Sequence, residues 1–327
     1  MPIVSEVLDN VMDRVFERSK RQQPLGLTSG FPELDRVIGE GWARQELTYL
    51  VGDSGVGKSW LATWFMVNGA HFLFEKPDQR PLPSVSLTAE QNAEHNTRRP
   101  IIVFWSMEMG QMPVIVRIVS LAVRLATGVS FNSADLRMGE IGCKEGDANF
   151  EERSAVFRRG YGILKNWGKH MCLDFDDRSV EDFAATLERL SVENDIVMVI
   201  IDYFRRISEF DSDGSMAMAQ EVRSMQLAEL AKEFDTHVFC IFDVTKLGQT
   251  ARRVHAEHMK GGTAAQYDAD LVLTMNLTSD KDDANMDSEV MVDLAVEKNR
   301  YGDRRTFRLM FDKRIGYFSL AERQQIV

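Results

Sequence analysis

One eight-residue segment constrains the fold of this chain more than any other feature. It matches the phosphate-binding P-loop pattern G-x-x-x-x-G-K-S at every fixed position. An apolar run at residues 47–51 precedes the segment and a helical pattern at residues 59–67 follows it. A loop between strand and helix predicts an α/β fold in which backbone N–H groups and the helix N-terminus bind phosphate. The segment consists of Gly52, Asp53, Ser54, Gly55, Val56, Gly57, Lys58 and Ser59.

The rest of the sequence alternates short apolar runs with helical patterns. We expect strands at residues 101–105, 171–175, 196–201 and 238–242, and helices at residues 113–127, 180–193 and 219–234. This order predicts a mainly parallel central sheet with helices on both faces. Further apolar runs without helices between them predict an antiparallel C-terminal extension, at residues 271–276, 290–296 and 306–311.

The N-terminal segment predicts a helical arm and linker, residues 1–24, ahead of a single P-loop domain at residues 25–327. The arm either packs on its own domain or docks on a neighbouring subunit, and the sequence leaves both open. Residues 74–99 are rich in proline and mixed charge, which predicts a surface insertion. Apolar side chains recur at helical spacing in the arm, at Val4, Leu8, Val11 and Val15.

Composition narrows the classes of function. The 327 residues carry a formal net charge of −11, which argues against a generally basic DNA-binding surface and confines any nucleic-acid contact to a local site such as a channel. The longest apolar runs are about six residues, far below the roughly 20 that span a membrane, and no leader pattern opens the chain. We expect a cytoplasmic protein with reduced cysteines, which are Cys143, Cys172 and Cys240.

A second motif supplies the carboxylate that a P-loop needs for its metal ion. The apolar residues 196–201 end in Asp202, the arrangement known as Walker B. In such sites the lysine, here Lys58, contacts the β- and γ-phosphates of ATP, while the hydroxyl of Ser59 and the aspartate hold Mg²⁺. The sequence therefore predicts ATP as ligand and Mg²⁺ as cofactor.

A third acidic residue is a candidate for catalysis. Glu108 follows the strand at residues 101–105, which we expect next to the P-loop strand. A carboxylate there can polarise the water that attacks the γ-phosphate. The alternative is an exposed loop glutamate without a catalytic role.

Several further blocks of sequence accompany the P-loop in a fixed order. They lie at residues 28–35, 106–109, 201–203, 227–233, 268–270 and 297–300. Together these blocks resemble the RecA-type motor domain of DnaB-like replicative helicases over nearly the whole chain. The resemblance implies a RecA-like P-loop NTPase core that assembles into a hexamer, hydrolyses ATP at subunit interfaces and moves along single-stranded DNA.

The resemblance also implies roles for two basic residues near the end of the chain. Lys298 and Arg300 match the family's Lys-x-Arg pair, which reaches into the ATP site of the neighbouring subunit. The arginine would act there as a finger on the γ-phosphate. A solvated basic strand end is the alternative.

A glycine-containing loop lies where the family's central-channel loop contacts DNA. Glycines let backbone N–H groups approach phosphates closely, and a lysine adds charge. A flexible loop without a ligand is the alternative. Arg205 and Arg206, after the Walker B strand, would face the channel or the neighbouring subunit. The loop residues are Lys260, Gly261, Gly262 and Thr263.

Some features depart from the family pattern. Asp243 occupies the position where the family usually has a glutamine that senses the γ-phosphate, and a carboxylate repels phosphate. Residues 209–213 are acidic, which weakens affinity for DNA. We expect no counterpart of the family's N-terminal primase-binding domain. These departures keep two alternatives open: a nucleotide-gated assembly scaffold that recruits a loader, primase or nuclease, and a recombinase-like ATPase with weak or no unwinding.

Overall fold

The structure of this chain is a computed structural model. It describes residues 26–81, 83, 84, 89–176, 179–207, 216–242, 244, 245, 248, 251, 253–259, 263–278 and 288–321, together with Met12 and Phe16. The backbone alone is described at residues 89, 92, 216–218, 263 and 264. The arm predicted at residues 1–24 lies outside these ranges apart from Met12 and Phe16, which are helical and exposed.

A single nine-stranded sheet forms the centre of the described chain, in the order β3-β2-β4-β5-β1-β6-β7-β8-β9. The strands from β3 to β6 pair in parallel, and β7, β8 and β9 add antiparallel pairs. The predicted α/β class and antiparallel extension are both confirmed. The strands are β1 (Leu47–Gly52), β2 (Arg99–Ser106), β3 (Met171–Asp174), β4 (Asn194–Asp202), β5 (His237–Phe242), β6 (Leu271–Leu277), β7 (Glu289–Asn299), β8 (Thr306–Asp312) and β9 (Tyr317–Leu320).

The strand order corrects one expectation. We predicted that the strand before Glu108 lies next to the P-loop strand, and this is wrong. β1, which leads into the P-loop, pairs with β5 and β6, whereas β2 pairs with β3 and β4. Strands that follow one another along the chain need not be neighbours when helical crossovers connect them.

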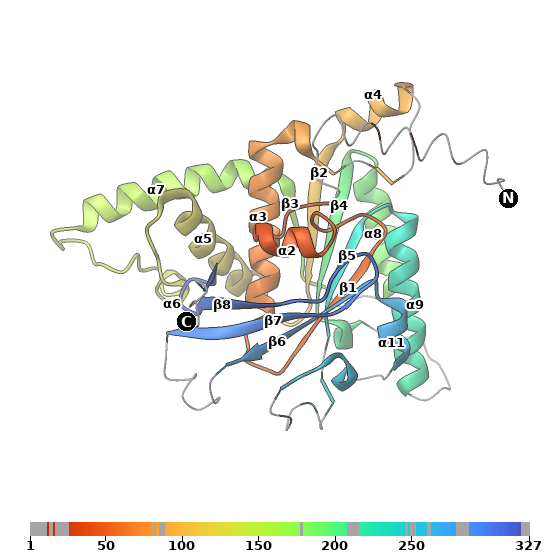
Figure 1. Ribbon diagram of the computed structural model, residues 1–327. Coiled ribbons are helices and arrows are strands. Elements are labelled where there is room, and N and C mark those ends of the chain that lie inside the picture. Colours follow the sequence, from red (N-terminus) through yellow and green to blue (C-terminus); the bar gives the residue numbers. More distant parts are fainter. Residues whose placement is uncertain are drawn as a thin grey trace.

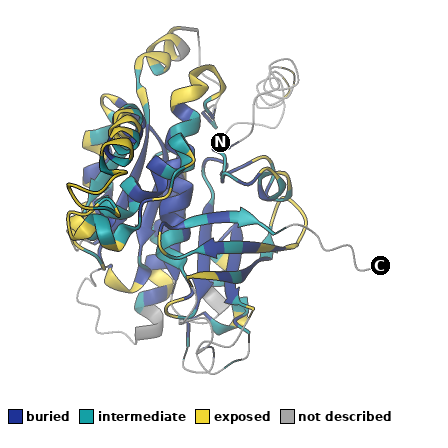
Figure 2. Cartoon of the chain, turned by 90° about the vertical axis from the view of Figure 1, so that its left-hand side faces the viewer, coloured by how far each residue is buried: buried dark blue, intermediate teal, exposed yellow. Residues whose placement is uncertain are grey.

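Helices cover both faces of the sheet, as predicted (Figure 1). One face packs against α2, α3, α5 and α7, and the other against α8, α9 and α11, which gives two apolar cores. The strands lie buried between these layers, while exposed residues lie along the outer helices (Figure 2). The helices are α2 (Pro32–Val37), α3 (Lys58–Glu75), α4 (Ala89–Thr97), α5 (Gln111–Thr127), α6 (Ser133–Arg137), α7 (Phe150–Trp167), α8 (Val180–Ser191), α9 (Met216–Glu233) and α11 (Thr263–Asp268).

The long helix α7 was not predicted from the sequence. It packs against α5, where Gly160 permits close approach, since a Cβ atom there would lie 2.8 Å from Cγ1 of Val123. Its buried residues Gly160, Leu164 and Trp167 recur at helical spacing, so the sequence carries a periodic signal for this helix that our predictions did not use. The buried residues of α7 are Ser154, Gly160, Leu164 and Trp167.

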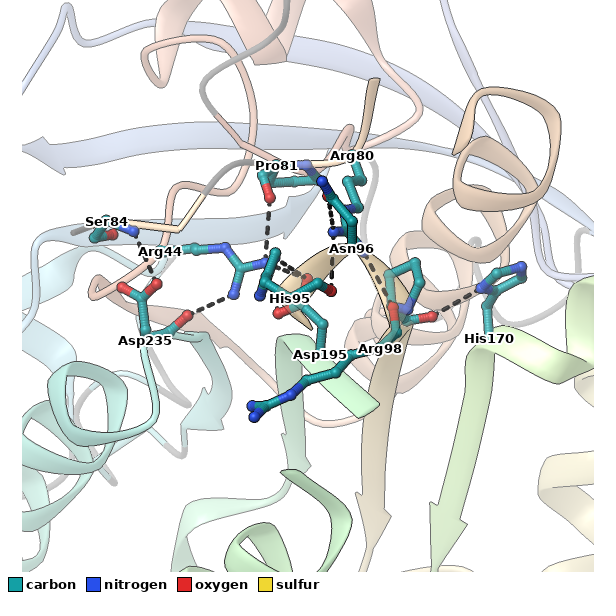
Figure 3. A network of polar contacts seen from close by, with 11 residues as sticks. Arg44, Arg80, Pro81, Ser84, His95, Asn96, Arg98, His170, Asp195 and Asp235 are labelled. Atoms are coloured by element: carbon teal, nitrogen blue, oxygen red, sulfur yellow. Dashed lines mark hydrogen bonds and ion pairs between the residues drawn. The ribbon is translucent and has the colours of Figure 1, made fainter. Parts of the chain in front are cut away.

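The segment predicted as a surface insertion, residues 74–99, begins in the last turn of α3 and ends at the first residue of β2. It contains the 3₁₀ turn η1 (Pro77–Gln79) and helix α4. A buried polar network joins it to the amino ends of the strands (Figure 3). Arg44 Nη2 donates to both Asp195 carboxylate oxygens at 2.8 Å and to the Pro81 carbonyl at 3.2 Å.

His95, from α4, completes this network, with Nε2 3.3 Å from the Asp195 carboxylate. Arg44 Nη1 also donates to the carbonyl of Asp235 at 2.7 Å. Although burial acts in the opposite direction, the Arg44 guanidinium and the His95 ring hold the pKa of Asp195 below its usual value. The insertion is therefore anchored to the sheet by a buried charge cluster.

Within the described ranges, no helix is both long and apolar enough to cross a membrane. None of the three cysteines forms a disulfide, and Cys240 is buried in β5.

Candidate nucleotide-binding site

The P-loop residues line a cavity of about 420 Å³ at the carboxyl ends of the parallel strands. This is the edge of an open α/β sheet at which ligands ordinarily bind. The cavity brings together residues from four separate stretches of the chain, among them Lys58, Ser59, Glu108, Arg117, Asp202 and Arg205.

The turn into α3 requires glycine at its last position. Gly57 has φ of +106°, a left-handed conformation that other residues avoid. A Cβ atom at Gly57 would also lie 2.6 Å from Cε1 of Phe311 on β8. Both the backbone conformation and the close packing therefore require glycine at this position. Gly57 is the N-cap residue of α3, so the helix N-terminus lies at the cavity.

The Lys58 side chain bends back toward the P-loop and bonds to its backbone. Its Nζ donates to the carbonyl oxygen of Gly52 at 2.7 Å and to that of Asp53 at 2.9 Å. Both acceptors are neutral, so an anionic phosphate in the cavity competes effectively for the same ammonium group. The Lys58 ammonium group therefore lies at the cavity, where it can exchange these carbonyl acceptors for a phosphate.

Asp202 has the environment of a metal ligand. It is fully buried at the end of β4, and neither of its carboxylate oxygens has a hydrogen-bond partner among the described residues. Burial raises the pKa of Asp202 to about 6; the neighbouring Ser59 hydroxyl lowers it and the Glu108 carboxylate raises it. Buried, unpaired carboxylate oxygens beside a hydroxyl are the oxygen donors that Mg²⁺ prefers, so Ser59 and Asp202 fit this ion.

Glu108 reaches the cavity from β2 through a loop tied to the Walker B strand. The backbone N–H of Met107 donates to the carbonyl of Asp202 at 2.8 Å, and the Ser106 hydroxyl donates to the carbonyl of Met109 at 3.1 Å. The Glu108 side chain is exposed at the cavity wall. β2 is not the neighbour of β1, yet this loop still brings the carboxylate to the P-loop side of the site.

The cavity is lined by two arginines that the sequence did not place at the P-loop. Arg117, from the second turn of α5, was not singled out at all, because an arginine within an apolar helix carries no motif of its own. Arg205, which we expect to face a DNA channel or a neighbouring subunit, lines the same cavity from the 3₁₀ turn η3 (Phe204–Arg206). Arg206, next in this turn, is exposed.

Lys298 and Arg300 lie far from this cavity in the same chain. Lys298 Nζ donates to the carbonyls of Ala269 at 2.6 Å, Tyr267 at 3.2 Å and Gln266, and burial lowers its pKa. Arg300 pairs with Asp270 at 3.1 Å, and Asp270 accepts from the N–H of Leu47, the first residue of β1. The two basic residues therefore lie at the amino end of β1, opposite the P-loop.

Other predicted site residues cannot be placed. Lys260, Gly261 and Gly262 lie outside the described residues, as do Asp243 and the acidic residues 209–213. Thr263 is the first residue of α11, described by its backbone only. No cluster of three or more metal-binding side chains occurs in the part of the chain that the structure covers.

A P-loop after a central parallel strand, with a buried acid ending a second strand, defines the class of RecA-like P-loop nucleotide-binding proteins. Within this class, the chain belongs to the family of DnaB-like helicase C terminal domains, whose family model matches residues 26–320. The resemblance seen in the sequence blocks is thereby confirmed.

Two proteins that are similar in sequence are named as replicative DNA helicases. The replicative DNA helicase DnaB of Mycoplasma genitalium is 24% identical over 88% of this chain and 54% of its own length. DnaB of Geobacillus stearothermophilus is 24% identical over 98% of this chain and 62% of its own length. The chain thus spans between 54% and 62% of the length of these two relatives.

Solved structures show the same fold. A structure described as an ATPase domain has a TM-score of 0.76 at 19% identity, covering 98% of this chain and all of that one. A DnaB-like replicative helicase, described together with its interactions with primase, has a TM-score of 0.70 at 19% identity, covering 97% of this chain and 67% of that one.

Proposed function

We propose that this chain is the motor domain of an ATP-dependent DNA helicase, which hydrolyses ATP at subunit interfaces while it moves on single-stranded DNA. The observation that carries the proposal is the convergence of Lys58, Ser59, Glu108 and Asp202 on one cavity. Family membership over residues 26–320 supports the same activity.

Within one subunit, these side chains divide the chemistry among them. The P-loop N–H groups and Lys58 bind the β- and γ-phosphates, and Lys58 leaves the carbonyls of Gly52 and Asp53 to do so. Ser59 and Asp202 would hold Mg²⁺, which neutralises charge on the phosphates when bound. Glu108 accepts a proton from the attacking water.

The neighbouring subunit would complete the site. Lys298 and Arg300 are separated from their own P-loop by the length of β1, which has six residues and therefore spans roughly 17 Å. In a ring, which we propose is a hexamer, the same residues would meet the γ-phosphate held by the next subunit.

Single-stranded DNA would be contacted at the loop of residues 260–263, with Arg206 as a further candidate. The net charge of −11 implies that this contact is local and confined to the channel. We also propose that the exposed helix α4 of the insertion serves partner binding, with a loader, a primase or a nuclease as candidates. Cysteines without disulfides fit a cytoplasmic protein.

ATP turnover with and without single-stranded DNA tests this function. We expect turnover in the wild-type chain, stimulation by DNA, and a loss of about 10²- to 10⁴-fold in Glu108→Gln, because the water loses its base. Glu151→Gln, at an exposed glutamate on α7 away from the cavity, is the matched control and should turn over like the wild type.

The contrary outcome is equally informative. ATP binding without turnover in the wild-type chain would refute the motor and favour the nucleotide-gated scaffold. Turnover without unwinding of a tailed duplex would favour the recombinase-like alternative. A Lys58→Ala chain that hydrolyses ATP at the normal rate would show that the P-loop is not the reaction site.

A further inference from the structure

Trp60 stands directly after the P-loop serine and lines the nucleotide cavity. The guanidinium carbon of Arg117 lies over its indole ring, 4.4 Å from the centroid. The turn between β8 and β9 packs against the same ring, since a Cβ atom at Gly316 would overlap its Cε3 and Cζ3. Gly316 has φ of +69°, so both its backbone and its missing side chain suit this contact. The ring is thus fixed between two elements distant in sequence.

Arg117 is a cation without a bonded anion among the described residues. Its Nη1 is buried and has no hydrogen-bond partner there either. Burial lowers the pKa of Arg117, and the carboxylates of Asp202 and Glu108 act in the opposite direction. The group is therefore near these two acids but bonded to neither. A buried charged donor in this state is costly, and an anion in the cavity removes the cost.

We infer that Trp60 is a positioning residue for ATP: its indole ring holds the Arg117 guanidinium at the cavity wall so that this group meets the terminal phosphate. Indole is the strongest aromatic partner of a cation, and a planar guanidinium stacks on it well. Fixing this long side chain before the nucleotide arrives reduces the entropy lost on binding. The inference rests on the proposed ATP binding and adds to it a device that distinguishes ATP from ADP.

Loss of the Trp60 ring should therefore affect the binding of ATP and of ADP differently. ADP lacks the terminal phosphate, so a loosened Arg117 should weaken ATP binding and leave ADP binding nearly unchanged. A general loss of packing around α3 would instead weaken both nucleotides, because both use the P-loop. The ratio of the two dissociation constants therefore separates positioning from a merely structural role.

Calorimetric titration of the full chain with ADP and with a slowly hydrolysed ATP analogue, both with Mg²⁺, provides the test. We expect Trp60→Leu to weaken binding of the analogue by about 5- to 10-fold and ADP binding by less than about 2-fold. Trp60→Phe, which keeps a ring, should retain most of the preference. Arg117→Gln should lose the preference as Trp60→Leu does, and the double variant should lose no more, because both changes remove one contact.

Trp64 offers a matched control on the same helix. It is 4% exposed, stacks on Phe31 at 5.0 Å and does not line the cavity, so Trp64→Phe should keep the wild-type preference. Trp60→Met, a second ring-free variant, is measured in parallel so that failure of one variant to fold leaves the test intact.

Two failures can be told apart. Equal weakening of both nucleotides in the ring-free variants, or additive losses in the double variant, would overturn the positioning role of Trp60. A wild-type chain that binds neither nucleotide would overturn the proposed ATP-binding function itself.

Discussion

The buried carboxylate of Asp202 destabilises the folded chain when it is ionised, but it suits the binding of a metal ion. Burial raises its pKa to about 6, so the folded chain holds its proton more tightly than the unfolded chain does. Stability therefore falls as pH rises from about 4 to about 6, and above this window the cost of the buried carboxylate is fully present. The unpaired oxygens that impose this cost are those available to a metal ion.

The variant Asp202→Asn should therefore be more stable than the wild type without nucleotide. At pH 7.5 we expect the free energy of unfolding to rise by roughly 2–3 kcal/mol, following the shift of the pKa from 3.8 to about 6. The gain should shrink as pH falls toward 4, and Mg²⁺-dependent nucleotide binding should be lost.

Denaturant unfolding between pH 4 and pH 8 measures this difference. Asp303→Asn, at an exposed residue, serves as the control for removing a carboxylate from the surface. Equal stability of Asp202→Asn and wild type at every pH would show that burial does not penalise the ionised carboxylate.

A buried polar network between several elements anchors the insertion at residues 74–99. The Asp195 carboxylate on β4, 5% exposed, joins Arg44, which precedes β1, and His95 from α4 (Figure 3). A buried pair of this kind contributes little compared with apolar packing, but removing one partner leaves the other charge unpaired.

We predict that Asp195→Ala lowers the free energy of unfolding by about 3–5 kcal/mol, because Arg44 remains buried without its anion. Arg80→Ala is a milder control: Arg80 donates to the carbonyls of His95 and Arg98, and its loss should cost about 1–2 kcal/mol. Chemical denaturation gives both values, and limited proteolysis should show faster cleavage near α4 in Asp195→Ala. A cost below about 1 kcal/mol would mean that the network does not anchor the insertion.

At the scale of the whole molecule, the sheet separates the two halves of the proposed active site. The P-loop follows the carboxyl end of β1, whereas Arg300 is held beside the amino end of the same strand. Each subunit therefore carries the P-loop half of one site at the carboxyl ends of the strands and the arginine half of another site at the amino ends. Turnover should require two subunits in contact.

Mixing inactive variants tests this arrangement. Arg300→Ala and Lys58→Ala chains should each lack ATP turnover alone. Equal mixtures should recover up to about a quarter of the wild-type rate, since one interface in four joins an intact P-loop to an intact arginine under random assembly. Lys58→Ala mixed with a chain that carries both Lys58→Ala and Arg300→Ala provides the control and should stay inactive. No recovery in subunits shown to exchange would place the arginine outside the neighbouring site.

The sequence by itself determined the features encoded in neighbouring residues. The strand–loop–helix of the P-loop, the buried strand ending in Asp202 and the antiparallel extension follow from local periodicity and from glycine chemistry. Such signals survive in one dimension because the residues that make each element are adjacent in the chain.

Only the tertiary structure decided which distant residues meet. It placed β4 and β5 between β1 and β2, brought Arg117 and Trp60 together beside the P-loop, placed Arg205 at the nucleotide cavity and fixed Arg300 at the opposite edge. The physical reason is the same in each case: strand order and helix packing depend on the burial of surfaces across the whole sheet, which no local pattern records.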